Sequence, residues 1–232
     1  DRGEPDDAIV STGLRGSDRQ IVYSARGIEQ FAVTGQVLVV TVSTPEGGSE
    51  LRLVSLADGA VETVPLPVAG TIRDLDTTTV GSVIGLTLEP AEPTDDPLGG
   101  RQLLLLDLES GRTFTTVTGL DGSPLEATAW LFVPGRTALI AQTVEGTIVL
   151  ADVAPGSIPT PLGRVAELVR FSRDGAVLAA RDALGGILVD LATGEQSRVE
   201  PSLIEGGLPF LGLLEPLPDG DIIEKAVLEA TD

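Results

Sequence analysis

Short aliphatic runs alternate with turn residues along most of the chain, and helical periodicity is scarce. One pattern occurs four times: an aliphatic strand, a polar residue, another aliphatic residue, a turn glycine, and then a second strand. The copies are residues 51–59, 103–111, 148–156 and 186–194, and their second strands are expected at 61–64, 112–117, 158–162 and 196–199. Glycine tolerates the positive φ that a tight turn requires, so each copy predicts a β-hairpin.

A second pattern precedes the hairpin. An apolar residue leads into a Pro/Asp/Gly turn, and an aliphatic strand follows at residues 132–139, 171–178 and 217–222, with weaker copies at 34–36 and 79–81. The two patterns together give a four-stranded unit. The turn glycines Gly59, Gly111, Gly156 and Gly194 are spaced by 52, 45 and 38 residues, close to the length of a β-propeller blade.

The predicted fold class is all-β, a single β-propeller domain of four-stranded blades over residues 1–232. Closing the last blade with strands from both chain ends removes exposed sheet edges, which favours five blades. An open fragment of a larger propeller is the alternative. The predicted blades are residues 28–66, 71–117, 125–162, 165–199, and 208–229 together with 8–24. The strands expected in this last blade include residues 8–12, 19–24 and 208–214. Trp130, Phe31, Phe132 and Phe171 are predicted to pack in the core between blades.

The turns at residues 171–175 (FSRDG) and 217–220 (LPDG) and the hairpin at 188–194 (LVDLATG) resemble the WD40-like (PD40-type) bacterial β-propellers. The Trp-Asp and Gly-His signatures of true WD40 repeats are missing, so the chain is more similar to the degenerate, exported relatives. The resemblance implies a platform for a binding partner, or an accessory domain of a larger protein.

The formal net charge of −20 argues against nucleic-acid binding, because phosphates would be repelled and no basic stripe offsets this. No apolar run reaches the roughly 20 residues of a membrane-spanning helix, so this segment is not expected to insert into a membrane. The chain contains no Met, which is expected of a processed or trimmed product. We predict an extracellular, cell-surface or periplasmic protein after removal of an export signal, although a trimmed chain fits equally well.

The chain contains neither Cys nor His, which excludes thiolate and Ser-His-Asp catalysis and the usual zinc sites. Paired carboxylates are the remaining catalytic option, with Asp74, Asp76 and Glu126 near predicted strand ends. Glycoside hydrolases need two carboxyl groups roughly 5–10 Å apart. A single Trp and a single Tyr offer little stacking surface for a sugar. We therefore predict no enzyme, no catalytic residues, and solvated turn acids at Asp74 and Asp76.

Residues 89–100 form an acidic, proline-rich insertion that is expected to be an exposed loop. Function concentrates on loops held by rigid scaffolds, so the insertion's acids are the predicted partner contacts. They are Glu89, Glu92, Asp95 and Asp96. No cofactor is predicted. Calcium is the alternative, because Asp95 with Asp96, and Asp219 with Asp221, offer clustered oxygen ligands, although neither pair has EF-hand spacing.

The leading functional hypothesis is a non-catalytic, exported or cell-surface propeller that binds a protein or cell-envelope partner. A structural spacer within a larger envelope protein is the second hypothesis, since acidic residues cluster at both chain ends. A carboxylate-based glycoside hydrolase is the third.

Overall fold

The computed structural model describes residues 7–12, 19–92, 100–109, 112–154 and 156–200, together with the backbone of residues 222–227. Every regular element in these ranges is a β-strand, and each pairing of known register is antiparallel. None of the described residues belongs to a helix with the length and hydropathy needed to cross a membrane. The predicted all-β class is confirmed.

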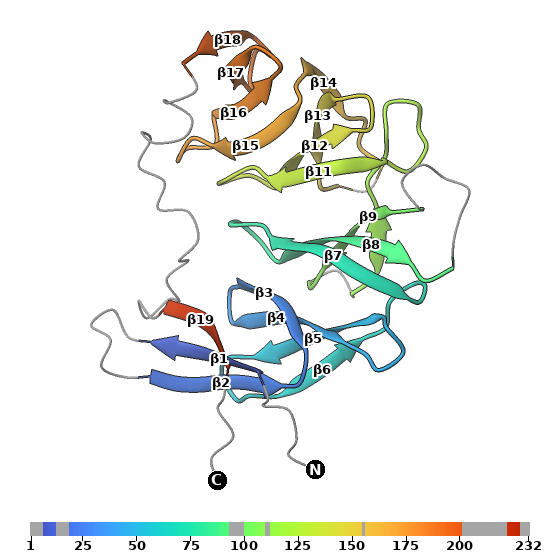
Figure 1. Ribbon diagram of the computed structural model, residues 1–232, viewed down its shortest axis with the longest axis vertical. Helices are drawn as coiled ribbons and strands as arrows, with labels where there is room; N and C mark the ends of the chain where they lie inside the picture. The colour runs from blue at the N-terminus through green and yellow to red at the C-terminus, as the bar shows by residue number, and fades with distance from the viewer. Residues whose placement is uncertain are drawn as a thin grey trace. The chain divides into compact units, whose positions relative to one another are not determined.

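The strands form four sheets of four strands and one sheet of three (Figure 1). Within each four-stranded sheet, the strands lie side by side in chain order. The first comprises β3 (Ile28–Thr34), β4 (Val37–Ser43), β5 (Ser49–Ser55) and β6 (Val61–Val64). The second comprises β7 (Gly70–Thr77), β8 (Val83–Pro90), β9 (Gln102–Asp107) and β10 (Phe114–Thr116). The third comprises β11 (Ala127–Phe132), β12 (Ala138–Thr143), β13 (Thr147–Asp152) and β14 (Thr160–Arg164). The fourth comprises β15 (Glu167–Phe171), β16 (Val177–Asp182), β17 (Gly185–Asp190) and β18 (Gln196–Val199).

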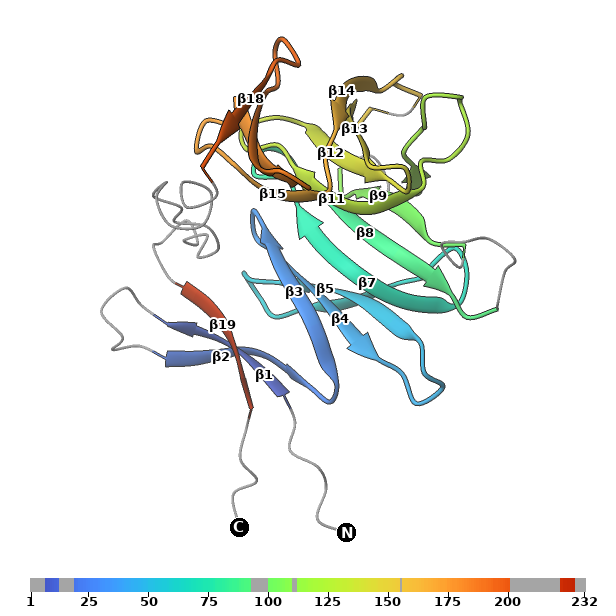
Figure 2. The ribbon, with the colours of Figure 1, turned by 45° about the horizontal axis from the view of Figure 1, so that its top comes forward.

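The three-stranded sheet joins the two ends of the chain. β1 (Asp7–Thr12) lies between β2 (Arg19–Ala25) and β19 (Ile222–Val227), as Figures 1 and 2 show. The pairing of β1 with β19 runs from Asp7 opposite Val227 to Thr12 opposite Ile222. The predicted N-terminal strands at residues 8–12 and 19–24 are therefore confirmed, and they pair with a C-terminal strand. The strand predicted at residues 208–214 lies outside the described residues.

The residue after the third strand of the recurring hairpin motif is held by its backbone in the same way in every four-stranded sheet. In each four-stranded sheet, the backbone N–H of that residue donates to a carbonyl in the turn between the first two strands. The donor–acceptor pairs are Leu56 to Gln36, Leu108 to Ser82, Val153 to Thr137 and Leu191 to Ala176, at 2.9–3.0 Å. The motif thus ties its hairpin to the turn predicted from the second repeated pattern.

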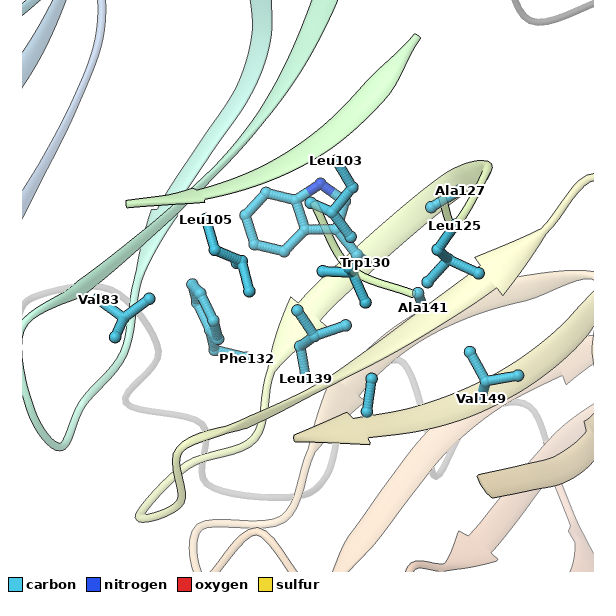
Figure 3. Packing of buried hydrophobic residues seen from close by; sticks show 12 residues of the cluster. Val83, Leu103, Leu105, Leu125, Ala127, Trp130, Phe132, Leu139, Ala141 and Val149 are labelled. Atoms are coloured by element: carbon cyan, nitrogen blue, oxygen red, sulfur yellow. The ribbon is translucent and has the colours of Figure 1, made fainter. Parts of the chain in front are cut away.

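The chain divides into two compact units, and the boundary falls within β7. Residues 1–75, 90–92 and 211–232 make up unit 1, and residues 76–89 and 93–210 make up unit 2. In unit 2, one buried cluster lies between β8, β9 and the sheet β11–β14, and Trp130 and Phe132 are at its centre (Figure 3). The two rings meet edge to face with centroids 5.4 Å apart, and the indole N–H donates to Thr87 Oγ1 at 2.8 Å.

A second cluster in unit 2 packs the sheet β11–β14 against the sheet β15–β18, which lie next to each other in Figures 1 and 2. Phe171, Leu178 and Val189 come from the β15–β18 side, and Ile140 and Ile148 from the β11–β14 side. The predicted core positions of Trp130, Phe132 and Phe171 are confirmed, since all three side chains are buried.

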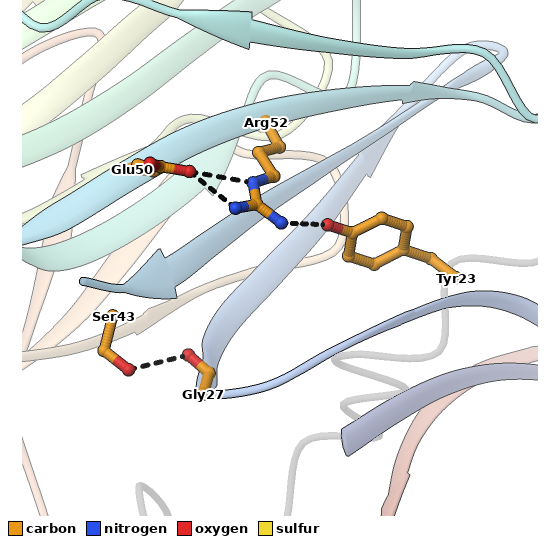
Figure 4. A network of polar contacts seen from close by, with 5 residues as sticks. All are labelled: Tyr23, Gly27, Ser43, Glu50 and Arg52. Carbon is orange, nitrogen blue, oxygen red and sulfur yellow. Dashed lines mark hydrogen bonds and ion pairs between the residues drawn. The ribbon is translucent and has the colours of Figure 1, made fainter. Parts of the chain in front are cut away.

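In unit 1, the sheet of the chain ends packs on the sheet β3–β6 through Ile9, Tyr23 and half-buried Phe31, among others. A polar link spans the same two sheets (Figure 4). Arg52 Nη1 donates to the Tyr23 hydroxyl at 2.8 Å, while Nε and Nη2 donate to Glu50 at 3.0 and 2.6 Å. Nearby, the Ser43 hydroxyl donates to the Gly27 carbonyl.

One local prediction needs correction, and another falls on a residue that the structure does not describe. The second strand of the third hairpin was expected at residues 158–162, but β14 begins at Thr160 and Ile158 is 81% exposed. Gly111 was expected to supply the turn's positive φ in the second hairpin. Gly111 lies outside the described residues, and Arg112 has a φ of 57°.

Candidate functional site

The predicted contact insertion starts within a strand. Glu89 belongs to β8, is half-buried, and faces Arg101 Nη2 at 3.8 Å. Glu92 is exposed just beyond the strand. Asp95 and Asp96 lie outside the described residues. The insertion therefore begins two residues later than predicted, and Glu89 is already partnered within the fold.

In the sheet β11–β14, the loop between the second and third strands packs against the segment that leads into the next sheet. Residues 144–146 join β12 to β13, and residues 165–166 lead from β14 into the next sheet. The Val165 N–H donates to the Gly146 carbonyl at 2.9 Å, and the Gln142 side chain donates to the Val165 carbonyl at 2.8 Å. A Cβ on Gly146 would already lie 3.0 Å from the Val165 carbonyl oxygen, so this junction is closed by backbone packing.

The sheet β7–β10 departs from that arrangement at both connections. Residues 91–101 join β8 to β9, and residues 117–126 lead from β10 to β11. The second connection folds back on itself, since the Leu125 N–H donates to Val117 at 2.7 Å and the Gly119 N–H to Ser123 at 2.6 Å. Asp121 caps its tip by accepting from the backbone N–H and the hydroxyl of Ser123, which lowers the pKa of that carboxyl.

A pocket of about 230 Å³ lies between these two connections. Buried Leu103 and Leu125, together with Pro124, give it an apolar part, and its lining also includes hydroxyl and charged side chains. The full lining is Gly100, Arg101, Gln102, Leu103, Thr116, Ser123, Pro124, Leu125 and Glu126. At the tip of the 117–126 connection, outside the lining, the Leu120 side chain is 51% exposed. The pocket is a product of the two lengthened connections.

Sequence reasoning did not find this pocket, although it placed the insertion on one side of it. The sequence feature that could have indicated the pocket is the extra length of one connection compared with the equivalent connection in the next repeat. Residues 117–126 are much longer than the equivalent connection at residues 165–166, and their Asp, Gly, Ser and Pro are typical turn formers. Glu126, which was considered only as a catalytic acid, is the one acidic residue in the lining.

Of the candidate catalytic carboxylates, Glu126 lies far from Asp76. Asp76 is half-buried in β7 and accepts hydrogen bonds from the N–H groups of Thr77 and Phe132. Glu126 precedes the first residue of β11, whereas Phe132 is its last, which separates Asp76 from Glu126 by the length of a strand, on the order of 20 Å. A glycosidase pair needs less than about 10 Å.

The prediction that Asp76 is a solvated turn acid is wrong. Burial raises the pKa of its carboxyl, against the opposing effect of the two backbone hydrogen bonds. Asp74 is exposed, as predicted. Among the described residues, no three Asp, Glu, His or Cys side chains are grouped as metal ligands. The acids considered for calcium, Asp95, Asp96, Asp219 and Asp221, lie outside the described residues.

Comparison with solved structures defines the class of fold. The chain is similar to oligogalacturonate lyase in complex with manganese (TM-score 0.60, 15% identity, covering 83% of this chain and 59% of that one). It is also similar to the dihydro-heme d1 dehydrogenase NirN (TM-score 0.55, 17% identity, 86% and 45%). A third similar structure is TolB from Acinetobacter baumannii (TM-score 0.51, 17% identity, 82% and 47%).

These likenesses, with the repeated four-stranded antiparallel sheets, support a β-propeller fold. The chain spans about half the length of the solved proteins that it matches. No protein-family model matches the sequence, and no curated protein matches it. The identities are low, so the likeness concerns the fold alone.

Proposed function

We propose that this chain is a non-catalytic β-propeller that binds a protein partner, and that it works outside the cytoplasm as an exported or cell-surface module. The observation that carries the binding role is the pocket at the break in the repeat, one of whose two connections also presents an exposed leucine at its tip. Elsewhere in unit 2 the equivalent junction is closed by the hydrogen bond from Val165 to Gly146. Loops on a rigid scaffold are where binding surfaces concentrate.

We further propose five blades, the last completed by strands from both chain ends. The pairing of β19 with β1 supports this arrangement, since both belong to one sheet with β2. The resemblance of the FSRDG and LVDLATG segments to exported bacterial propellers supports a location outside the cytoplasm.

Affinity capture with a shortened variant tests the binding role. Replacing residues 91–99 by a Gly-Ser-Gly linker should preserve folding, because residues 144–146 make the equivalent connection in the next sheet. Wild-type and shortened chains would be crosslinked in a cell-envelope extract and the captured proteins quantified by mass spectrometry. One protein enriched by the wild type and depleted with the variant is expected. No enrichment by the wild type over an unrelated acidic protein would favour a spacer role instead.

A further inference from the structure

The pocket at residues 100–103 and 123–126 is small. Pockets that enclose whole small-molecule ligands usually measure about 300–1,000 Å³, whereas this one measures about 230 Å³. Its lining combines an apolar part from Leu103, Pro124 and Leu125 with a carboxylate at Glu126. This combination suits one long side chain that has an apolar stem and a charged end.

The charges around the pocket favour a basic end. Arg101, the basic residue of the lining, is near Glu89, with 3.8 Å between Nη2 and Oε1. Glu126 is exposed, and no ion pair engages it within the described part of the chain. The pocket with Glu89 therefore carries one excess negative charge, and the whole chain carries −20. Long-range attraction of this sign speeds the encounter with basic partners.

We propose that the pocket receives a lysine or arginine side chain from a basic segment of a protein partner. The methylene stem packs on Leu125 and Pro124, and the cationic end pairs with Glu126. The hydroxyls of Thr116 and Ser123, which also line the pocket, are acceptors for its remaining N–H groups. This inference rests on the proposed protein-binding function and names the chemistry that the partner must present.

Blocked pentapeptides with one central Arg, Lys, Gln or Glu among Gly and Ala are the probes. Each would be titrated into the ¹⁵N-labelled full chain while amide chemical shifts are recorded. The Arg and Lys peptides should shift the amides of residues 100–103, 123, 125 and 126, whereas the Gln and Glu peptides should not. Shifts with the Glu peptide at these amides would assign the pocket to an acidic group facing Arg101 and overturn the proposal.

Glu126→Gln should weaken Arg-peptide binding about fivefold, the loss of one exposed ion pair, and Glu126→Arg should abolish it. Glu109→Arg is the matched control, because Glu109 is also exposed but follows the far end of β9. Equal binding by wild type and Glu126→Arg would overturn the proposal. Unchanged thermal unfolding of both variants excludes misfolding as the cause of lost binding.

The same variants separate this inference from the proposed function. A protein captured equally by wild type and Glu126→Arg would leave the binding role standing and overturn the pocket as its site. Chemical-shift changes confined to the pocket amides on addition of the Arg or Lys peptide, without any captured protein, would support the pocket's preference for a basic side chain. They would count against the protein-binding role.

Discussion

Gly85 lies directly beneath the buried aromatic pair of unit 2. A Cβ at this position would lie 2.7 Å from Trp130 Cη2 and 3.0 Å from Phe132 Cε2. Both rings are fixed in the core, and the indole is held by its hydrogen bond to Thr87. The lack of a side chain at residue 85 therefore makes room for the ring of Trp130 against β8.

Gly85→Ala should destabilise the chain by roughly 1–3 kcal/mol, the usual cost of overpacking a core. Denaturant unfolding followed by far-ultraviolet circular dichroism measures this change, and this probe also serves in variants that lack Trp130, the one tryptophan of the chain. The cost should shrink in a Trp130→Phe background, because the smaller ring relieves part of the clash. Wild-type stability for Gly85→Ala would contradict the packing described.

Asp76 provides a pH-dependent prediction at the same scale. Burial raises the pKa of its carboxyl in the folded chain, so the folded state holds the proton more tightly than the unfolded state. The stability gained from this tighter proton binding is complete below 3.8, the pKa of the carboxyl in the unfolded chain. It is lost as the pH rises through the pKa of the carboxyl in the folded chain. Asp76→Asn keeps an oxygen acceptor for the N–H of Phe132 and does not titrate.

The Asp76→Asn variant should therefore gain stability over wild type as pH rises above about 4, because only the wild type must give up a proton that its folded state holds more tightly. Chemical unfolding at several pH values measures the difference. Asp74→Asn is the control, because it removes the same charge from an exposed site on the same strand. An Asp76→Asn curve that parallels wild type at every pH would refute this account.

At the scale of elements, the hairpins were predictable because their signals are local. Aliphatic runs and turn glycines identified β5–β6, β9–β10, β13–β14 and β17–β18, all of which pair as hairpins. Strand ends were less predictable, as the exposure of Ile158 shows. The pocket was not predictable, because it combines two connections that the sequence separates by β9 and β10. Asp76 likewise accepts a hydrogen bond from the N–H of Phe132, a residue of another sheet that no local pattern pairs with it.

Tyr23 and Arg52 connect two sheets of unit 1 from strands β2 and β5. Tyr23→Phe removes the acceptor of Arg52 Nη1. The free energy of unfolding should fall by about 0.5–1.5 kcal/mol, the net contribution of one hydrogen bond. The cost stays this small because water can reach the half-buried guanidinium and replace the lost partner. A double-mutant cycle with Arg52→Leu isolates the contact, because Tyr23→Phe should then cost little. Equal costs of Tyr23→Phe in both backgrounds would show that the hydroxyl stabilises the chain through other groups.

At the scale of the whole molecule, β19 from the C-terminal part of the chain supplies the hydrogen-bonding partner for one edge of β1 near the N-terminus. Ile9 and Val10 are at most 2% exposed in β1, which has a neighbour on each side. Deleting residues 222–232 would leave one edge of β1 without this partner. Unpaired edges of this kind recruit other strands.

We expect this deletion to lower the free energy of unfolding by several kcal/mol, since each backbone hydrogen bond contributes about 0.5–1.5 kcal/mol. The shortened chain should also self-associate in light scattering. A peptide of residues 219–232 added in trans should restore both properties, and a milder deletion of residues 228–232, which retains β19, is the control. A stable monomer after the larger deletion would show that the pairing is dispensable and would remove the support for a blade shared between the chain ends. Rescue by the peptide alone would establish that β19 acts as a strand, because no other part of the chain is then altered.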